Sequence, residues 1–314
     1  MRKKGKDGQR KLRFFKTLLL FFTLLLIAVF GKRIFFWFKG GWGGKSQLSK
    51  AIETEEKDIL IAVLTPAKGT AMAIFVPRDL KVETASFGPI LAGKLSLLAE
   101  QEKKPEIFSK SLQYFLKIPI DPEPEQVRFM ASRESEQILK IEDKTERGAK
   151  EALVKFFSSF ASFESLRIKR FLKSRETMWN FIDLTDFCKE EELIDGNIAL
   201  ILLRNVFEEK VKGKFADPLV LEENFGIEVY NSGDTAGLAQ KIGEIIVNFG
   251  GKVVSDGNKE GAGDYDCLIK VLNKKMPKTI TVRRLKNIFN CFVQIDSKMA
   301  QGIGDIKMFV KRVE

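Results

Sequence analysis

The clearest secondary-structure pattern lies between Gly226 and Ser255, GIEVYNSGDTAGLAQKIGEIIVNFGGKVVS. Its first five residues predict a short strand, and the Asn-Ser-Gly-Asp sequence after them predicts a tight turn. Residues 235–249 predict a helix because large apolar side chains recur on one face, and Gly250-Gly251 ends it. Residues 252–255 then predict a second strand. A strand, a helix and a strand in this order indicate the α/β fold class.

The remainder of the C-terminal segment extends this pattern. A glycine-rich loop over 256–263 precedes a predicted strand over 265–272, a helix over 281–289 and strands over 291–295 and 305–311. The predicted order is β-α-β-β-α-β-β, a small domain over 224–314 in which two helices pack on a mixed sheet.

Two apolar segments upstream predict a β-hairpin. Asp58 to Thr65 (DILIAVLT) and Thr70 to Pro77 (TAMAIFVP) are rich in aliphatic residues, and Pro66-Ala-Lys-Gly69 between them is typical of a turn. Helical spacing of apolar residues predicts helices over 90–101 and 105–117. The glycine-rich and polar residues of 39–57 indicate a linker.

Residues 125–223 carry weaker patterns. They predict helices over 146–160, 163–175 and 197–212 and a strand over 179–184. The large apolar residues in these stripes indicate core positions rather than contacts to a cofactor.

The composition limits the chemistry of the chain. Its 314 residues include 53 Lys and Arg, 42 Asp and Glu and no histidine, for a net charge of +11. The absence of histidine excludes Ser-His and Cys-His nucleophile pairs and zinc sites of the HExxH type. Residues 1–50 hold thirteen Lys and Arg and one acidic residue, whereas the other 264 hold 40 basic and 41 acidic groups. The positive charge therefore belongs to the N-terminus alone.

The N-terminal segment predicts a membrane anchor. Thr17 to Gly31 contains no charged residue, and the apolar stretch that starts at Phe14 corresponds to about 27 Å of helix. We expect a transmembrane helix over 17–38, with the basic tail 1–16 in the cytoplasm and the rest of the chain outside it. The predicted location is therefore the cytoplasmic membrane, crossed once. A cleaved signal peptide is the alternative, but no Ala-x-Ala-like site follows Phe30.

The basic tail also raises the alternative of a membrane-tethered regulator that binds DNA. Residues 1–16 offer only Phe14 and Phe15 for aromatic contacts with bases, and their charges already serve orientation and attraction to anionic lipids. Nucleic acid is therefore not an expected partner.

The chain contains three cysteines, Cys188, Cys267 and Cys291. Because three is a small and odd number, the sequence does not predict a disulfide framework. We expect small buried apolar residues at these positions, which say little about the redox compartment.

Val229 to Ala239 (VYNSGDTAGLA) is a strand that ends in Asn, followed by a turn of small residues and then Gly-Leu-Ala. This pattern resembles the opening of the LytR C-terminal domain. The likeness continues through Gly251–Asn258, Asp264–Ile269 and Gly302–Asp305, so it covers about 224–314.

The residues of this turn have a physical interpretation of their own. We expect Asn231 to adopt a left-handed turn conformation and Gly237 to let the helix approach its strand closely. A loop that opens a helix can bind an anion, but Asp234 lies in this one and neither G-x-G-x-x-G nor a P-loop lysine is present. A structural turn is therefore the favoured interpretation.

Three motifs in the N-terminal half are Asp58-Ile-Leu-Ile, Val76-Pro-Arg78-Asp79 and Leu116-Lys-Ile-Pro-Ile-Asp121. They resemble the LytR-CpsA-Psr domain of bacterial envelope proteins, and residues 58–223 are expected to be a degenerate α/β region of that kind. The family's enzymes are anchored by one N-terminal helix and transfer glycopolymers from a polyprenyl pyrophosphate carrier to peptidoglycan.

The resemblance implies three candidate catalytic residues. By position, Asp58 matches the acidic residue of the family's D-T-I-M strand, and Arg78 and Asp79 match its P-R-D. In a pyrophosphate site, the arginine would contact phosphate in bidentate fashion and the carboxylates would hold Mg²⁺ or orient the arginine.

The departures from the family pattern weaken the enzyme interpretation. Lys117 replaces the glycine of G-I-P-I-D, the linker occupies the place of the strand before D-T-I-M, and the later arginine clusters have only an echo in Arg167-Ile-Lys-Arg170. A phosphate pocket needs several converging cations, and Arg78 alone is secure. The favoured interpretation of Arg78 and Asp79 is therefore an ion pair at a strand end.

Two functional hypotheses follow. The leading one is a membrane-anchored, extracytoplasmic envelope protein, non-catalytic or weakly active, that binds a cell-wall component or another envelope protein and needs no secure cofactor. The alternative is a Mg²⁺-dependent glycopolymer phosphotransferase that uses Asp58, Arg78 and Asp79.

Overall fold

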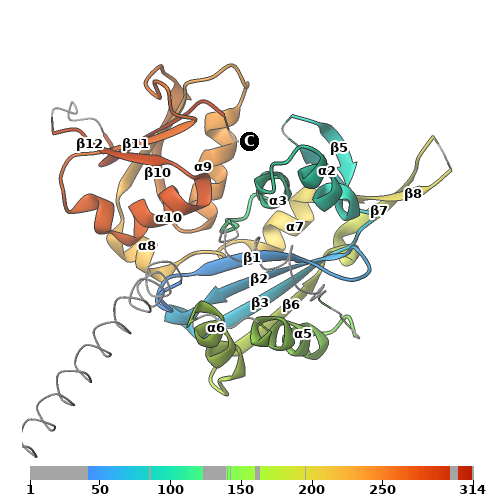
Figure 1. Cartoon of the computed structure of the whole chain (residues 1–314). Helices are drawn as coiled ribbons and strands as arrows, with labels where there is room; N and C mark the ends of the chain where they lie inside the picture. Colours follow the sequence, from blue (N-terminus) through green and yellow to red (C-terminus); the bar gives the residue numbers. More distant parts are fainter. Residues whose placement is uncertain are drawn as a thin grey trace, which may run out of the picture.

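The computed structural model describes residues 42–84, 86–122, 139, 141, 143–159, 163–194, 196–297 and 303–312 (Figure 1). The predicted tail over 1–16 and the predicted transmembrane helix over 17–38 lie outside these residues. Within the described ranges, no helix is both long enough and apolar enough to cross a membrane.

A four-stranded sheet forms the centre of the N-terminal half. Its strand order is β1 (Leu48–Glu53), β2 (Ile59–Thr65), β3 (Thr70–Val76) and β6 (Met178–Asp183). The first three strands are antiparallel, and β6 is parallel to β3. The predicted hairpin and the strand predicted over 179–184 are confirmed. The linker predicted over 39–57 is wrong where β1 lies, because Leu48 to Ile52 are buried and pair along β2.

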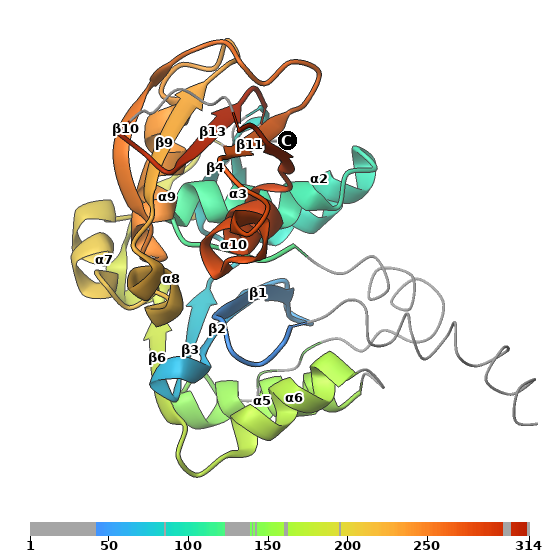
Figure 2. The ribbon, with the colours of Figure 1, turned by 90° about the vertical axis from the view of Figure 1, so that its left-hand side faces the viewer.

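Helices cover both faces of this sheet, which explains why β2 is apolar along its whole length (Figures 1 and 2). Alternate residues of β2 enter two cores, one of which contains Ile59, Ile61 and Val63 and the other Leu60, Ala62 and Leu64. The first core includes α2 (Leu95–Gln101), α3 (Glu106–Leu116) and α7 (Arg204–Val211), and the second includes α5 (Glu146–Ser158) and α6 (Phe163–Lys173). The result is a three-layer α/β/α arrangement.

Two of the predicted helices are corrected in part. The helix expected over 90–101 begins only at Leu95, because β5 (Gly88–Leu91) pairs with β4 (Lys81–Thr84). In the helix expected over 197–212, residues Ile198–Leu202 instead form strand β8, paired with β7 (Cys188–Glu192). The sequence Ile-Ala-Leu-Ile-Leu suits a buried strand as well as a helix, and pairing with a neighbouring segment decides between them.

The C-terminal domain has the predicted element order β-α-β-β-α-β-β. Its sheet has the order β10 (Lys252–Asn258), β9 (Gly226–Asn231), β13 (Ile306–Val310), β11 (Cys267–Val271) and β12 (Phe292–Ile295). Only the β11–β13 pair is antiparallel, so the sheet is mixed as predicted. α9 (Leu238–Asn248) and α10 (Ile280–Phe289) share one buried core with the apolar residues of this sheet.

The two halves are packed against each other. Val220 of the short helix α8 (Pro218–Glu223) and Tyr114 of α3 both enter the core of the C-terminal domain. The Glu223 carboxylate accepts hydrogen bonds from the first two N–H groups of α10, Ile280 and Thr281, at 2.8 and 2.7 Å. The C-terminal domain therefore includes residues that precede 224.

Cys267 and Cys291 are buried as predicted, but they are joined in a disulfide that the sequence did not predict. The parallel register that pairs Leu268 with Phe292 places the residues before them side by side, with their Cα atoms 4.5 Å apart. Cys188 is the free cysteine, and it is half-buried.

Candidate functional site

The hairpin brings the three predicted site residues to one end of the sheet. Asp58 directly precedes β2, and Arg78 and Asp79 follow β3, whose Val76 pairs with Ile59. Asp58 Oδ1 accepts a hydrogen bond from the backbone N–H of Arg78 at 2.8 Å. The predicted proximity is therefore real, but the contact that Asp58 makes is to the backbone of Arg78 and not to its guanidinium group.

Asp58 is buried beside a very small cavity. Only 6% of its surface is exposed, and Oδ2 lies 3.9 Å from Lys144 Nζ, which itself lies over the Phe75 ring. Burial raises the pKa of Asp58, and the hydrogen bond from Arg78 and the nearby cations offset only part of that rise. The cavity, which Thr54 also lines, has a volume of about 20 Å³. That volume holds about one water molecule, so a pyrophosphate group does not fit.

The side chains of Arg78 and Asp79 are exposed and do not line this cavity. Arg78 Nε lies 3.7 Å from Asp79 Oδ2, and more than half of each side chain is exposed. Arg78 Nη1 also donates to the Glu56 carbonyl oxygen at 3.3 Å. This arrangement matches the predicted strand-end ion pair.

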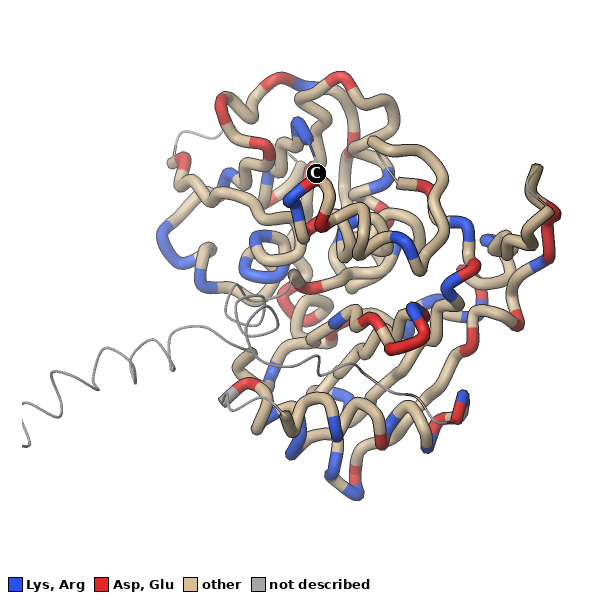
Figure 3. Tube along the Cα trace, turned by 45° about the vertical axis from the view of Figure 1, so that its right-hand side comes forward, with Lys and Arg blue, Asp and Glu red and all other residues tan. Residues whose placement is uncertain are grey.

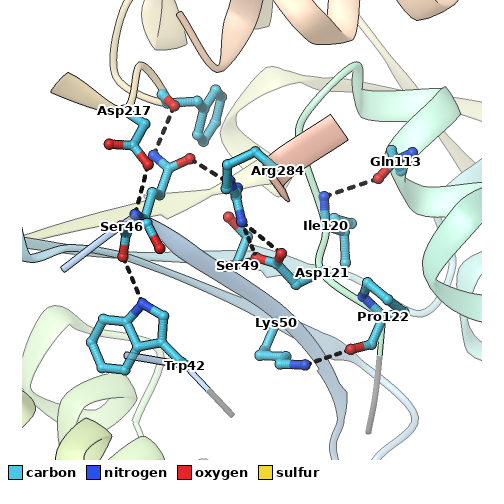
Figure 4. A network of polar contacts seen from close by, with 12 residues as sticks. Trp42, Ser46, Ser49, Lys50, Gln113, Ile120, Asp121, Pro122, Asp217 and Arg284 are labelled. Carbon is cyan, nitrogen blue, oxygen red and sulfur yellow. Dashed lines mark hydrogen bonds and ion pairs between the residues drawn. The ribbon is translucent and has the colours of Figure 1, made fainter. Parts of the chain in front are cut away.

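Asp121, at the end of the Ile-Pro-Ile-Asp segment, is bound to the C-terminal domain (Figure 4). Arg284 Nη1 of α10 donates to both carboxylate oxygens at 2.6 and 2.7 Å, and the Ser49 N–H donates to Oδ2 at 2.8 Å. Both charged side chains are more than nine-tenths buried. Gln47 extends the network, since its backbone N–H donates to Asp217 Oδ2 at 2.8 Å and its side-chain amide donates to the Phe215 carbonyl oxygen.

Lys117 forms a second connection between the halves. Its backbone is left-handed (φ 55°, ψ 31°), and it ends α3 where the family motif has glycine. Nζ lies 2.8 Å from Glu208 of α7 and 3.0 Å from Glu244 of α9, and the Asn248 side-chain amide donates to the Lys117 carbonyl oxygen at 2.7 Å. Burial by itself lowers the pKa of Lys117, but the hydrogen bonds to the two glutamates raise it more, so the net shift is upward.

A groove of about 740 Å³ lies around Lys117, between the two halves of the chain. The end of α3, one side of α7, one face of α9 and strand β10 contribute its lining. It is far larger than the cavity beside Asp58, and its volume is within the range of about 300–1,000 Å³ that is typical of ligand sites.

Sequence reasoning missed both Lys117 and Arg284. In α10, Arg284 lies three residues after the buried Thr281 and four before the buried Ile288, so it is on the buried face. A cation at a core position of an amphipathic helix is the signal that predicts a buried ion pair. Lys117 could have been recognised because it replaces the glycine of the G-I-P-I-D motif.

The expected roles of the turn residues are corrected. Gly237 has the left-handed φ of 71° as the N-cap of α9, and nothing lies within 4 Å of where its Cβ would be, so conformation rather than close approach requires glycine there. Asn231 lies in β9, and its side chain accepts from the Gly233 N–H and donates to the Thr235 carbonyl oxygen. The turn is held by an asparagine side chain and not by a left-handed asparagine.

Metal and anion sites have little support in the described ranges. Those residues contain no group of three or more Cys, Asp and Glu that could hold a metal ion. Lys and Arg are interspersed with Asp and Glu along both halves (Figure 3).

Several solved structures are similar to part of this chain. No protein-family model matches it, and no curated protein matches it either. The crystal structure of B. subtilis TagT has a TM-score of 0.37 and 14% identity and covers 55% of this chain and 91% of its own. The LytR-CPS2A-psr family protein YwtF (TagT) with bound octaprenyl pyrophosphate lipid has a TM-score of 0.38 and 14% sequence identity. The match covers 55% of this chain and 90% of YwtF. The crystal structure of B. subtilis TagU has a TM-score of 0.33 and 10% sequence identity, and the match covers 53% of this chain and 96% of TagU.

One of these neighbours is described as a LytR-CPS2A-psr family protein, and the three neighbours cover 53–55% of the chain.

Proposed function

We propose that this chain is a membrane-anchored envelope protein that binds a cell-wall component or another envelope protein and does not transfer glycopolymers. The observation that carries the proposal is the arrangement around Asp58. Its carboxylate accepts a hydrogen bond from the backbone N–H of Arg78 and lies beside a cavity of about 20 Å³. The Arg78 guanidinium is exposed and paired with Asp79. A pyrophosphate site needs an open cavity with several converging cations and, for a metal-dependent enzyme, metal ligands.

The disulfide supports a location outside the cytoplasm. Disulfides persist in oxidising compartments and are rare in cytosolic proteins. The Cys267–Cys291 bond lies in the C-terminal domain, which the basic N-terminal tail is expected to place outside the membrane. The two cysteines of the disulfide therefore favour an oxidising compartment outside the cytoplasm, in agreement with the proposal.

The alternative is a glycopolymer phosphotransferase. The proximity of Asp58, Arg78, Asp79 and Lys144 at one end of the sheet favours it. It would require the cavity beside Asp58 to expand greatly and the exposed Arg78 guanidinium to enter it.

The proposal is tested by separating binding from transfer. The full-length chain, purified in detergent, is incubated with isolated peptidoglycan and a lipid-linked glycopolymer, and covalent polymer attachment and co-sedimentation are both measured. We expect no attachment, and equal sedimentation for the wild type and for Arg78→Ala. Covalent attachment by the wild type that Arg78→Ala abolishes would establish the transferase instead.

A further inference from the structure

The groove between the two halves has a lining in which short apolar side chains alternate with carboxylates. Leu116, Val211, Val247 and Val253 supply the apolar part. The charged part consists of Glu208, Glu209, Glu244, Asp256, Lys117 and Lys212. Four acidic groups against two basic ones leave the groove negative. In the described part of the chain no aromatic ring lines it, so it offers no flat face on which a sugar ring could stack.

The pairing of these charges shows which carboxylates are available. Lys117 neutralises Glu208 and Glu244 by direct contact. Glu209 of α7 and Asp256 of β10 are exposed, and neither forms an ion pair with any described residue. These two carboxylates come from opposite halves of the chain, so a ligand that met both would bridge the halves.

Lysine and arginine side chains match this lining. Each combines an apolar stem, which packs on aliphatic surface, with a cationic head that remains near carboxylates and water. Lys117 shows the match within the protein itself, since its ammonium group occupies the space between two of the four carboxylates. An anionic glycopolymer has the opposite charge complementarity and would be repelled.

We propose that the groove binds a basic polypeptide segment of a partner protein, with Lys or Arg side chains directed at Glu209 and Asp256. This proposal deepens the proposed function by naming the chemistry of the partner, and it rests on the chain being a binding protein. Lys117 acts as an internal competitor in this groove, because it holds two carboxylates that an incoming cation would otherwise contact.

The test uses the full-length chain in detergent and a fluorescent, acetylated tri-lysine amide as the probe, with binding followed by anisotropy at low salt. We expect Glu209→Gln and Asp256→Asn each to weaken binding about threefold, the amount typical of an exposed ion pair, and the double variant to weaken it about tenfold. Glu100→Gln on α2, which removes one exposed carboxylate outside the groove, is the matched control and is expected to leave binding unchanged.

Lys117→Gly provides a variant that should gain affinity. It frees Glu208 and Glu244, so we expect tri-lysine to bind at least threefold more tightly, and the effect to fall with added salt. Loss of binding that is equal in Glu100→Gln and in the groove variants, no gain in Lys117→Gly, or groove-dependent binding of the neutral glycan chitotetraose in place of tri-lysine would each overturn the proposal. None of these outcomes depends on polymer transfer, so failure here is distinguishable from failure of the proposed function.

Discussion

Arg284 of α10 holds Asp121 through two hydrogen bonds from one nitrogen, at 2.6 and 2.7 Å, and both side chains are buried. The residue that ends the Ile-Pro-Ile-Asp segment is thereby part of the contact between the N-terminal half and the C-terminal domain. A carboxylate so engaged is not available to a phosphate or a metal ion. The family-like motif in this chain therefore contributes to the structure of the interface.

Removal of one partner of this ion pair should be costly. We expect Arg284→Ala to lower the free energy of unfolding by about 3–5 kcal/mol, because it leaves the Asp121 charge buried without its cation. Arg284→Met combined with Asp121→Leu should recover most of that loss. Urea unfolding of the full-length chain measures both variants. Arg147→Ala, which breaks an exposed pair with Glu151, is the control and should leave the midpoint unchanged. A midpoint for Arg284→Ala equal to that of the control would contradict this account.

Lys117 permits a comparison of backbone strain with charge pairing. Lys117→Gly and Lys117→Ala both remove the contacts to Glu208 and Glu244, but only glycine adopts the left-handed conformation without strain. We expect the glycine variant to be more stable than the alanine variant by about 1 kcal/mol. Thermal unfolding at neutral pH measures the difference. Equal stability of the two variants would show that the left-handed backbone at 117 is not maintained.

The raised pKa of Asp58 predicts a specific pH dependence. Because the folded-state pKa lies above the ordinary value of 3.8, the protonated form favours folding, and this contribution is lost as the pH rises through the folded pKa. Asp58→Asn keeps an oxygen that can accept from the Arg78 N–H but carries no buried charge. We expect the variant at pH 7 to be as stable as the wild type or more stable, with a weaker loss of stability as the pH rises above the ordinary carboxyl range. Marked destabilisation at pH 7 would mean that the contact with Lys144 outweighs burial.

The disulfide should contribute substantially to the stability of the C-terminal domain. Cys267 and Cys291 are 24 residues apart, and a closed loop of this length is worth about 3 kcal/mol in the chain-entropy model. We expect the double serine variant to lose about that amount, and Cys188→Ser to lose less than 1 kcal/mol. Burial first, and then Asp183, raise the pKa of Cys188 to about 11, so this thiol should react slowly with iodoacetamide at pH 8. Two rapidly reacting thiols in the unreduced protein would contradict the disulfide assignment.

The C-terminal fold could be predicted because its local signals agree. The strand over 226–230 and the stripes of α9 and α10 have periodicities that do not depend on distant residues, and the structure confirms them. The segment Ile198–Leu202 and strand β1 could not be assigned in this way. Their conformation depends on pairing with β7 and β2, which local sequence does not report.

For the site residues too, local sequence predicts some features, whereas others depend on residues that are distant in the sequence. The hairpin prediction was sufficient to bring Asp58 and Arg78 to one end of the sheet. Their orientation, the small cavity and the pairing of Asp121 with Arg284 depend on contacts between residues as many as 163 positions apart. The disulfide was missed for the same reason, since the register of β11 and β12 brings its two cysteines together.

A titration of the full-length chain with farnesyl pyrophosphate, a short polyprenyl pyrophosphate, in the presence and absence of Mg²⁺ tests whether the chain has a pyrophosphate site. Isothermal calorimetry on the wild type and on Arg78→Ala reports binding without any requirement for turnover. We expect no saturable, Mg²⁺-dependent heat for either protein, because the cavity beside Asp58 holds about one water molecule and Arg78 is paired with Asp79 at the surface. Saturable, Mg²⁺-dependent binding by the wild type that Arg78→Ala abolishes would contradict it.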